Sequence, residues 1–562
     1  MKITIGDFLI NRLKEVGIEH LIGVPGDFNL QLLEQLKEHE GIRFVGASNE
    51  LNAAYAADGY SRERGIGAFL VTYGVGDLGA LPGVAGSMAE HVPVIAISGT
   101  PPQFAMEHNF RVHHSLADGD FENMKNAYEE FTVDTGTITQ ENAQEEIDRL
   151  LRLALLHKKP VNIQVPSNIT YLTINWDGEP LKPLKHKSDK ERLKTVVKEM
   201  LEKYKKAKNP VVLVDLDMDR LEIKKEILAF IEKTKTPFAT LSTGKAILDE
   251  SHGLYLGVYK GDKSDSGVQK KVEESDFLLT VSPRFIEKNS GRYTSDLPEQ
   301  HLIRLGRNHT FVGTEVYEGV YVKDLLKKFN KKVQEKEKEI PVAHYDKTEP
   351  RVFKDKALDH KHFWRQVEGF LEEGDMVFAE TGSSAQALAE LRMPKDTTFI
   401  TSQIWGAIGH MLPALYGSLL SNNKRRQLLF IGDGSFQVTS AALSRILYEE
   451  LNPIIFLINN DGYTIERYIM GMKESYNDIP QWDYHKLPDV FCPGHKMKVF
   501  NCKTQEDLRD TLQELKGLKH GAFIEVHLDP FDAPEALKKF GPGVAQFNYG
   551  DKGPVNEEPE EE

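Results

Sequence analysis

Residues 427–435 read QLLFIGDGS, and residues 454–463 read IIFLINNDGY. Each stretch is an apolar, β-rich run that ends in glycine and polar side chains, as a buried parallel strand does when a functional turn follows it. The spacing between Asp433 and Asn460 leaves room for one crossover helix, which we expect over residues 439–450. Two neighbouring strand ends would then lie at the same edge of an α/β sheet.

These two strand ends carry hard oxygen ligands. Asp433 offers a carboxylate and Asn460 an amide oxygen, and a backbone carbonyl nearby would complete a set suited to Mg²⁺. Gly432 and Gly434 let the backbone approach a phosphate closely. The alternative is an ordinary strand–turn–helix with a capping aspartate. It does not explain why two neighbouring strand ends both carry oxygen ligands and glycine.

The motif GDGS followed by NNDGYTIE resembles the metal and diphosphate motif of thiamine-diphosphate enzymes. Its extended form resembles the pyruvate, indolepyruvate and branched-chain 2-oxo acid decarboxylases. The resemblance implies that Mg²⁺ is bound by Asp433, Asn460 and the carbonyl of Gly462. The residues it implies around the diphosphate of thiamine diphosphate are Gly432, Asp433, Gly434 and Ser435.

Four polar residues of the first 115 are candidates for acid–base chemistry. Taken alone, Asp27 is typical of a turn and Glu50 of a helix start, where the dipole favours an acid. His113 and His114 form a poor metal motif but suit proton transfer. All four match the decarboxylase branch, in the expected order. The resemblance implies that Glu50 binds the aminopyrimidine ring, that Asp27 and His114 carry protons and that His113 supports them.

Further site residues follow from the resemblance. Glu466 should lie near the substrate carboxylate, and Ile408 should hold the cofactor in a bent shape, with Gly406 beside the pyrimidine edge. Where relatives commonly carry bulky aromatics, residues 383–386 read SSAQ, which predicts a widened pocket. The substrate pocket is expected to comprise Thr381, Ser384, Ala385, Gln386, Ile465, Phe540 and Val544.

Residues 74–79, GVGDLG, match the dinucleotide-binding pattern GxGxxG literally. A dinucleotide site also needs an acid at the end of the next strand, but the strand expected at residues 94–98 is followed by Gly-Thr-Pro-Pro instead. We therefore expect these glycines to form a tight turn that lines the cofactor cleft.

The chain has 562 residues with 70 basic and 85 acidic side chains, a net charge of −15. This charge argues against nucleic acid and against an anionic membrane surface as partners. There is no run long and apolar enough to span a bilayer, and the first residues run straight into an amphipathic helix pattern. With only two cysteines, Cys492 and Cys502, a cytoplasmic protein is expected.

Strand-like and helical runs alternate throughout, which predicts an α/β fold of three doubly wound parallel-sheet domains. We expect a pyrimidine-binding domain at 1–180, a central domain at 190–340 and a diphosphate- and metal-binding domain at 355–545. The acidic tail, 546–562, is expected to be disordered. The family resemblance implies a homodimer with shared active sites, commonly assembled into a homotetramer.

The resemblance implies that the reaction is non-oxidative decarboxylation of 2-oxo acids to aldehydes and CO₂. Branched-chain or longer aliphatic and aromatic substrates fit the expected pocket. The alternatives are a pyruvate- or indolepyruvate-preferring decarboxylase and a carboligase resembling acetolactate synthase. A catalytically silent scaffold is a further alternative, which the intact acid–base residues disfavour.

Overall fold

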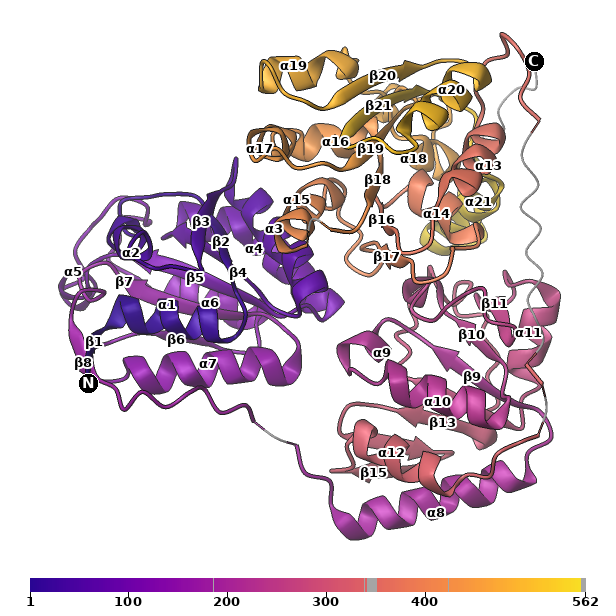
Figure 1. The fold of residues 1–562 in the computed structure, drawn as a ribbon, viewed down its shortest axis with the longest axis horizontal. Coiled ribbons are helices and arrows are strands. Elements are labelled where there is room, and N and C mark those ends of the chain that lie inside the picture. The colour runs from indigo at the N-terminus through magenta and orange to yellow at the C-terminus, as the bar shows by residue number, and fades with distance from the viewer. Residues whose placement is uncertain (185, 338, 341–350, 423, 557–562) are drawn as a thin grey trace.

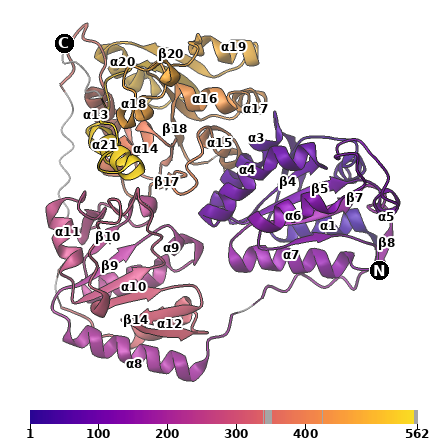
Figure 2. The ribbon, with the colours of Figure 1, turned by 180° about the vertical axis from the view of Figure 1, so that it is seen from behind.

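The computed structural model describes residues 1–184, 186–337, 339–340, 351–422 and 424–556. The chain folds into three α/β domains in sequence order (Figure 1). The N-terminal domain and the C-terminal domain lie side by side, and the central domain lies below the C-terminal one. The reverse view shows the same arrangement (Figure 2).

The N-terminal domain is built on a six-stranded parallel sheet of order β3-β2-β4-β5-β7-β6. Its strands are β2 (His20–Gly23), β3 (Arg43–Gly46), β4 (Gly67–Thr72), β5 (Val94–Thr100), β6 (Thr135–Thr137) and β7 (Val161–Pro166). A short antiparallel pair, β1 (Lys2–Thr4) and β8 (Thr173–Asn175), joins the ends of the domain. Its helices are α1 (Ile5–Glu15), α2 (Leu30–Leu36), α3 (Glu50–Arg64), α4 (Val75–Glu90), α5 (Gln103–Glu107), α6 (Glu122–Phe131) and α7 (Ala143–His157).

The C-terminal domain repeats this design with a parallel sheet of order β17-β16-β18-β19-β21-β20. Numbered from the first strand of each sheet, both domains have the order 2-1-3-4-6-5, a similarity that their sequences do not display. Its strands are β16 (Met376–Ala379), β17 (Thr398–Ile400), β18 (Gln427–Gly432), β19 (Ile454–Asn459), β20 (Lys498–Cys502) and β21 (Ala522–His527). Its α-helices are α13 (His360–Phe370), α14 (Ser383–Glu390), α15 (Met411–Ser421), α16 (Asp433–Thr439), α17 (Ala442–Tyr448), α18 (Thr464–Ile469), α19 (Leu487–Phe491), α20 (Gln505–Leu515) and α21 (Glu535–Tyr549).

The central domain has a seven-stranded sheet of order β11-β10-β9-β12-β13-β14-β15. Its first five strands in this order are parallel, whereas β14 and β15 pair antiparallel at one edge. The predicted α/β class is therefore confirmed, with an antiparallel edge that the prediction did not include. The strands are β9 (Pro210–Val214), β10 (Phe238–Thr240), β11 (Tyr255–Val258), β12 (Phe277–Val281), β13 (Leu302–Leu305), β14 (His309–Val312) and β15 (Glu315–Glu318). The helices are α8 (Lys190–Lys206), α9 (Asp217–Arg220), α10 (Lys224–Thr234), α11 (Ser266–Glu273) and α12 (Val322–Lys332).

The crossover between β18 and β19 differs from its prediction. We expected one helix over 439–450, but two short helices, α16 and α17, occupy the segment. The first begins at Asp433 itself, so the turn after β18 is already helical. It ends at Thr439, whose hydroxyl donates a hydrogen bond to the carbonyl of Gly409 (2.7 Å).

Helix α21 continues to Tyr549, past the expected start of the acidic tail at 546. The side chain of Asn556 donates a hydrogen bond to the carbonyl of Arg467 (2.6 Å) and accepts one from the backbone N–H of Met472 (3.2 Å). The tail residues 557–562 and residues 341–350, which fall between the predicted central and C-terminal domains, lie outside the described residues. Among the described residues, the structure contains no helix with the length and apolar character needed to cross a bilayer.

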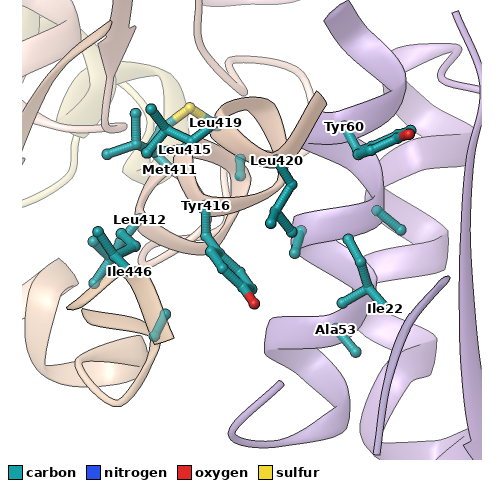
Figure 3. Packing of buried hydrophobic residues seen from close by; sticks show 14 of the residues in the cluster. Ile22, Ala53, Tyr60, Met411, Leu412, Leu415, Tyr416, Leu419, Leu420 and Ile446 are labelled. Atoms are coloured by element: carbon teal, nitrogen blue, oxygen red, sulfur yellow. The ribbon is translucent and has the colours of Figure 1, made fainter. Parts of the chain in front are cut away.

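Helices α3 and α15 cross at very short range and join the N-terminal and C-terminal domains (Figure 3). A Cβ atom added to Gly417 would lie 1.7 Å from the carbonyl oxygen of Ala56, and one added to Gly59 would lie 1.9 Å from that of Ala414. Both positions therefore require glycine. One buried hydrophobic cluster runs through both domains here, and it includes Ile22, Tyr60, Leu415, Tyr416 and Leu420.

Candidate active site

A cavity of about 570 Å³ opens at the carboxyl ends of the C-terminal strands. It lies over β16, β18 and β19, whose ends carry the two motifs identified in the sequence. The predicted residues that line it are Thr381, Ser384, Gly406, Ile408, Gly432, Asp433, Gly434, Ser435, Asn460, Gly462, Ile465, Glu466, Phe540 and Val544.

Asp433 is the buried acid of this cavity, with 1% of its surface exposed. Its carboxylate accepts hydrogen bonds from the backbone N–H groups of Gly434 (2.8 Å), Gly462 (3.1 Å) and Asn460 (3.3 Å). Burial raises the pKa of the Asp433 carboxyl to about 7, and the three donors oppose that rise. A bound cation would favour the charged form of this acid, so the site suits a metal.

Asn460 and Gly462 are placed beside that carboxylate by the turn after β19. The side-chain Nδ2 of Asn460 donates to the Thr464 hydroxyl (2.7 Å), which leaves the amide Oδ1 as the atom available to a cation. Gly462 has φ +127°, and a Cβ there would lie 2.2 Å from the carbonyl oxygen of Asn477. The turn therefore depends on glycine. The donor set of this site, a carboxylate and amide oxygens, fits Mg²⁺.

The loop 402–409, which carries Gly406 and Ile408, is held by both other domains. At the end of α4, Glu90 accepts hydrogen bonds from the backbone N–H groups of Ile404 (2.9 Å) and Trp405 (3.3 Å). Ser242 of the central domain donates to Gln403 Oε1 (3.0 Å). Ile408 is 39% exposed and borders the cavity. The three domains together thus fix the segment expected to support the cofactor.

Two residues of the expected substrate pocket lie elsewhere. Helix α14 begins at Ser383, so successive side chains point in different directions around the helix. Ser383 and Ser384 line the cavity, whereas Ala385 is buried in the hydrophobic core of the domain. Gln386 lines a neighbouring cavity of about 300 Å³ between the central and C-terminal domains.

Glu50 opens α3 at the carboxyl edge of the N-terminal sheet. It packs against α4, where Cβ atoms added to Gly79 and Gly76 would lie 3.2 Å from Glu50 Cβ and 3.7 Å from Glu50 Cγ. The glycine-rich segment 74–79 thus makes room for this glutamate, consistent with the rejection of a dinucleotide site. Glu50 is not among the described residues that line the 570 Å³ cavity of its own chain.

Asp27, His113 and His114 form a second polar group in the N-terminal domain. His113 Nε2 lies 2.8 Å from Asp27 Oδ2, and His114 Nε2 lies 3.9 Å from Asp27 Oδ1. The ring of Phe28 stacks on that of His113 at 5.0 Å. The structure therefore brings these three predicted residues together, but among the described residues none of them lines the cavity around Asp433.

The sequence interpretation missed the contribution of the central domain to the cavity. Glu287, Lys288 and Arg292 line it from the segment between β12 and β13. The buried side chain of Asn289 fixes this segment, since it accepts from the backbone N–H of Ile286 (2.9 Å) and donates to the carbonyl of Arg284 (2.9 Å). No motif marks these residues, because they reach the site only through the packing of one domain on another.

Comparison with known protein families shows which class of enzyme the chain belongs to. Three family models match it: the N-terminal TPP binding domain of thiamine pyrophosphate enzymes over residues 3–122, the central domain over 197–325 and the C-terminal TPP binding domain over 380–526. It is thus a thiamine pyrophosphate enzyme by domain composition.

Curated relatives cover nearly the whole chain. Pyruvate decarboxylase isozyme 1 of Saccharomyces cerevisiae is 35% identical over 556 residues, 95% of this chain and 97% of the relative. Pyruvate decarboxylase of Kluyveromyces marxianus is 36% identical over 562 residues, 97% and 99% of the two chains. An alpha-keto-acid decarboxylase of Mycobacterium leprae is 34% identical over 540 residues, 95% and 94% of the two chains. The chain belongs to the thiamine-diphosphate-dependent 2-oxo acid decarboxylase family.

Proposed function

We propose that this enzyme converts branched-chain or longer aliphatic and aromatic 2-oxo acids to aldehydes and CO₂, and accepts pyruvate as well. The observation that supports this choice is the composition of the cavity wall. Beside the polar cofactor end it has an apolar side formed by Ile465, Ile469, Phe540 and Val544. Residues 381–384 also line the cavity and supply only small side chains, so a long acyl chain has room.

We assign several residues of the cavity a role in cofactor binding or catalysis. Asp433, Asn460 and the Gly462 carbonyl would hold Mg²⁺ and with it the diphosphate, and Ile408, which lines the same cavity, would support the cofactor. When bound, thiamine diphosphate supplies the electron sink for loss of CO₂. Glu466 borders the cavity and would lie next to the substrate carboxylate.

We propose that a second copy of the chain completes the site. Glu50 and the group formed by Asp27, His113 and His114 belong to the N-terminal domain, so a partner's domain would bring them to the cavity around Asp433. Glu50 would then hydrogen-bond the aminopyrimidine ring. Asp27 and His114, supported by His113, would move a proton to the forming aldehyde.

Exposed apolar side chains beside both halves of the site support this assembly. On α4, Val75 and Leu78 are 56% and 53% exposed and flank the glycines that pack against Glu50. Ile408, 39% exposed, lines the cavity, and Val438, 44% exposed, lies beside Gly409 of the same loop. Exposed apolar residues at both places are typical of a subunit interface. A homodimer, assembled further into a tetramer, would cover them. Sedimentation velocity measures this oligomeric state.

The cytoplasmic location expected from the two cysteines stays a prediction.

The substrate range is tested by a panel of pyruvate, 2-oxoisovalerate and 2-oxooctanoate, with aldehyde release coupled to an alcohol dehydrogenase. We expect kcat/KM for the longer acids to equal or exceed that for pyruvate. Ser384→Phe and Val544→Phe should narrow the cavity and shift the preference toward pyruvate. Val490→Phe, at a position 68% exposed on another face, is the matched control. A steep preference of the unmodified enzyme for pyruvate would contradict the proposed range.

A carboligase resembling acetolactate synthase is the second candidate reaction. The same assay distinguishes it, because a carboligase would yield acyloin in place of free aldehyde.

A further inference from the structure

A separate cavity of about 260 Å³ lies where the three domains meet. Arg62 lines it from the C-terminal end of α3 in the N-terminal domain. Arg220 lines it from the end of α9 in the central domain. Residues 397–401 of the C-terminal domain, which include β17, complete the wall. This cavity shares no lining residue with the one around Asp433.

Four residues that line this cavity each have a buried donor atom without a partner among the described residues. Within the described part of the chain, no hydrogen-bond acceptor is found for Arg62 Nη2, Arg220 Nε, Thr397 Oγ1 or Thr401 Oγ1. The threonines are 6% and 7% exposed. Buried donors are normally paired, and leaving one unpaired is costly. Four of them around one cavity therefore indicate a ligand rich in acceptors.

Two hydrogen bonds hold the Arg62 guanidinium in place, and its Nη2 group has no acceptor among the described residues. Its Nε donates to Asp58 (2.5 Å) and its Nη1 to the carbonyl of Thr401 (3.3 Å), and its side chain is 3% exposed. Arg220 is 10% exposed at the side chain, and its pKa is lowered by burial and by the positive charge of Arg62. Each guanidinium has one carboxylate partner, Asp58 for Arg62 and Asp219 for Arg220, and each keeps one N–H group without an acceptor among the described residues. An anion bound between the two would accept from both of these groups.

Both acids of the cavity wall, Glu63 and Asp219, already accept hydrogen bonds. Glu63 accepts a hydrogen bond from Asn422 Nδ2 (2.7 Å). Asp219 is 56% exposed at its side chain and accepts from Arg220 Nη1 (3.2 Å), which leaves Arg220 Nε directed elsewhere. Of the other cations, Lys245 is paired with Glu250 (3.0 Å), and Lys224 adds positive charge to the wall.

We propose that this junction is a binding site for a small oxyanion of the phosphate class, bound by Arg62, Arg220, Thr397 and Thr401. Phosphate offers acceptor oxygens in several directions, and charge-assisted hydrogen bonds from guanidinium groups suit it. Because the four donors come from all three domains, the bound anion stabilises their relative arrangement. The site is separate from the catalytic cavity and does not depend on the proposed substrate range.

The test is thermal unfolding of the full chain with its cofactor present, at increasing phosphate and at ionic strength held constant with chloride. We expect the Tm to rise and saturate, because a ligand that binds only the folded state stabilises it. Thr397→Val removes one hydroxyl without changing the shape of the side chain, and Arg220→Met removes one cation. Each should weaken phosphate binding at least about tenfold. The matched controls are Thr195→Val and Arg509→Met on exposed helical surfaces, which should titrate like the unmodified chain.

Parallel titrations with sulfate and acetate separate a tetrahedral anion from a carboxylate; the proposal expects sulfate to bind and acetate to be weaker. ³¹P line broadening of added phosphate gives a second measurement, which remains usable if Arg220→Met fails to fold. Absence of a saturable response, or a response that Thr397→Val leaves unchanged, would overturn the proposal and leave a cavity filled with water.

Discussion

The crossing of α3 and α15 makes a quantitative prediction for Gly417→Ala. The added Cβ would lie 1.7 Å from the Ala56 carbonyl oxygen, whereas real Cβ atoms essentially never come within 3.0 Å of a neighbouring atom. The two helices would have to separate by about 1.3 Å or distort, because the opposing atom belongs to the backbone. Overpacking of this kind costs ~3 kcal/mol at the upper end of its usual range. The better helix propensity of alanine returns ~1 kcal/mol. The net loss should be about 2 kcal/mol.

The assay is urea unfolding followed by far-UV circular dichroism, together with kcat. We also expect a lower kcat, because α3 begins at Glu50 and α15 follows the loop that carries Ile408. Gly369→Ala is the matched control: it lies in helix α13, and a Cβ there would meet nothing within 4 Å. That variant should be unchanged or slightly more stable. If Gly417→Ala matches Gly369→Ala in both stability and kcat, the short-range crossing described here is wrong.

Three further predictions concern the carboxylates. Glu50→Gln should keep its fold and lose at least about a hundredfold in kcat. Glu34→Gln, at an exposed position of α2, is the control. Near-normal turnover of Glu50→Gln would exclude a role for Glu50 in proton transfer. Asp433→Asn should weaken Mg²⁺ and thiamine diphosphate binding at least about tenfold by calorimetry, and unchanged affinity would place the metal elsewhere. Burial raises the pKa of Glu380 to about 8 from its ordinary 4.5, so the folded state retains this proton more strongly than the unfolded chain. Its contribution to stability is fullest below pH 4.5 and is lost as pH rises through 8, by at most about 5 kcal/mol. Glu380→Gln should reduce the difference between the urea midpoints measured at pH 5 and pH 8. The same difference in the variant and in the unmodified chain would contradict this prediction.

The strand ends of the C-terminal domain could be predicted from sequence because their signals are local. An apolar run followed by glycine and a polar residue locates the edge of a parallel sheet, and the carboxyl edge is where Asp433 and Asn460 meet. The helix start at Asp433 was harder, since the same glycines permit either a loop or a first helical turn. Whether Ser384 or Ala385 faces the cavity depends on where α14 begins, and a shift of one residue changes the answer.

Contacts between domains were beyond sequence reasoning. Arg292 and Lys288 border the cavity only because the central domain packs against the C-terminal one. The donors of the three-domain junction are unremarkable when read singly, as two arginines at helix ends and two threonines beside a strand. The matching strand orders of the first and third domains likewise emerge only in three dimensions.

The central claim is that Glu50 of one chain serves the Asp433 site of another, and subunit mixing tests it most directly. Glu50→Gln chains and Asp433→Asn chains are denatured together and refolded in equal amounts, with thiamine diphosphate and Mg²⁺ at concentrations that saturate the unmodified enzyme but leave each variant nearly inactive alone. If sites are shared, each mixed dimer contains one site with both residues intact, so the mixture should regain about a quarter of the unmodified activity. If each chain carried a complete site of its own, every site would retain one lesion and the mixture would stay inactive.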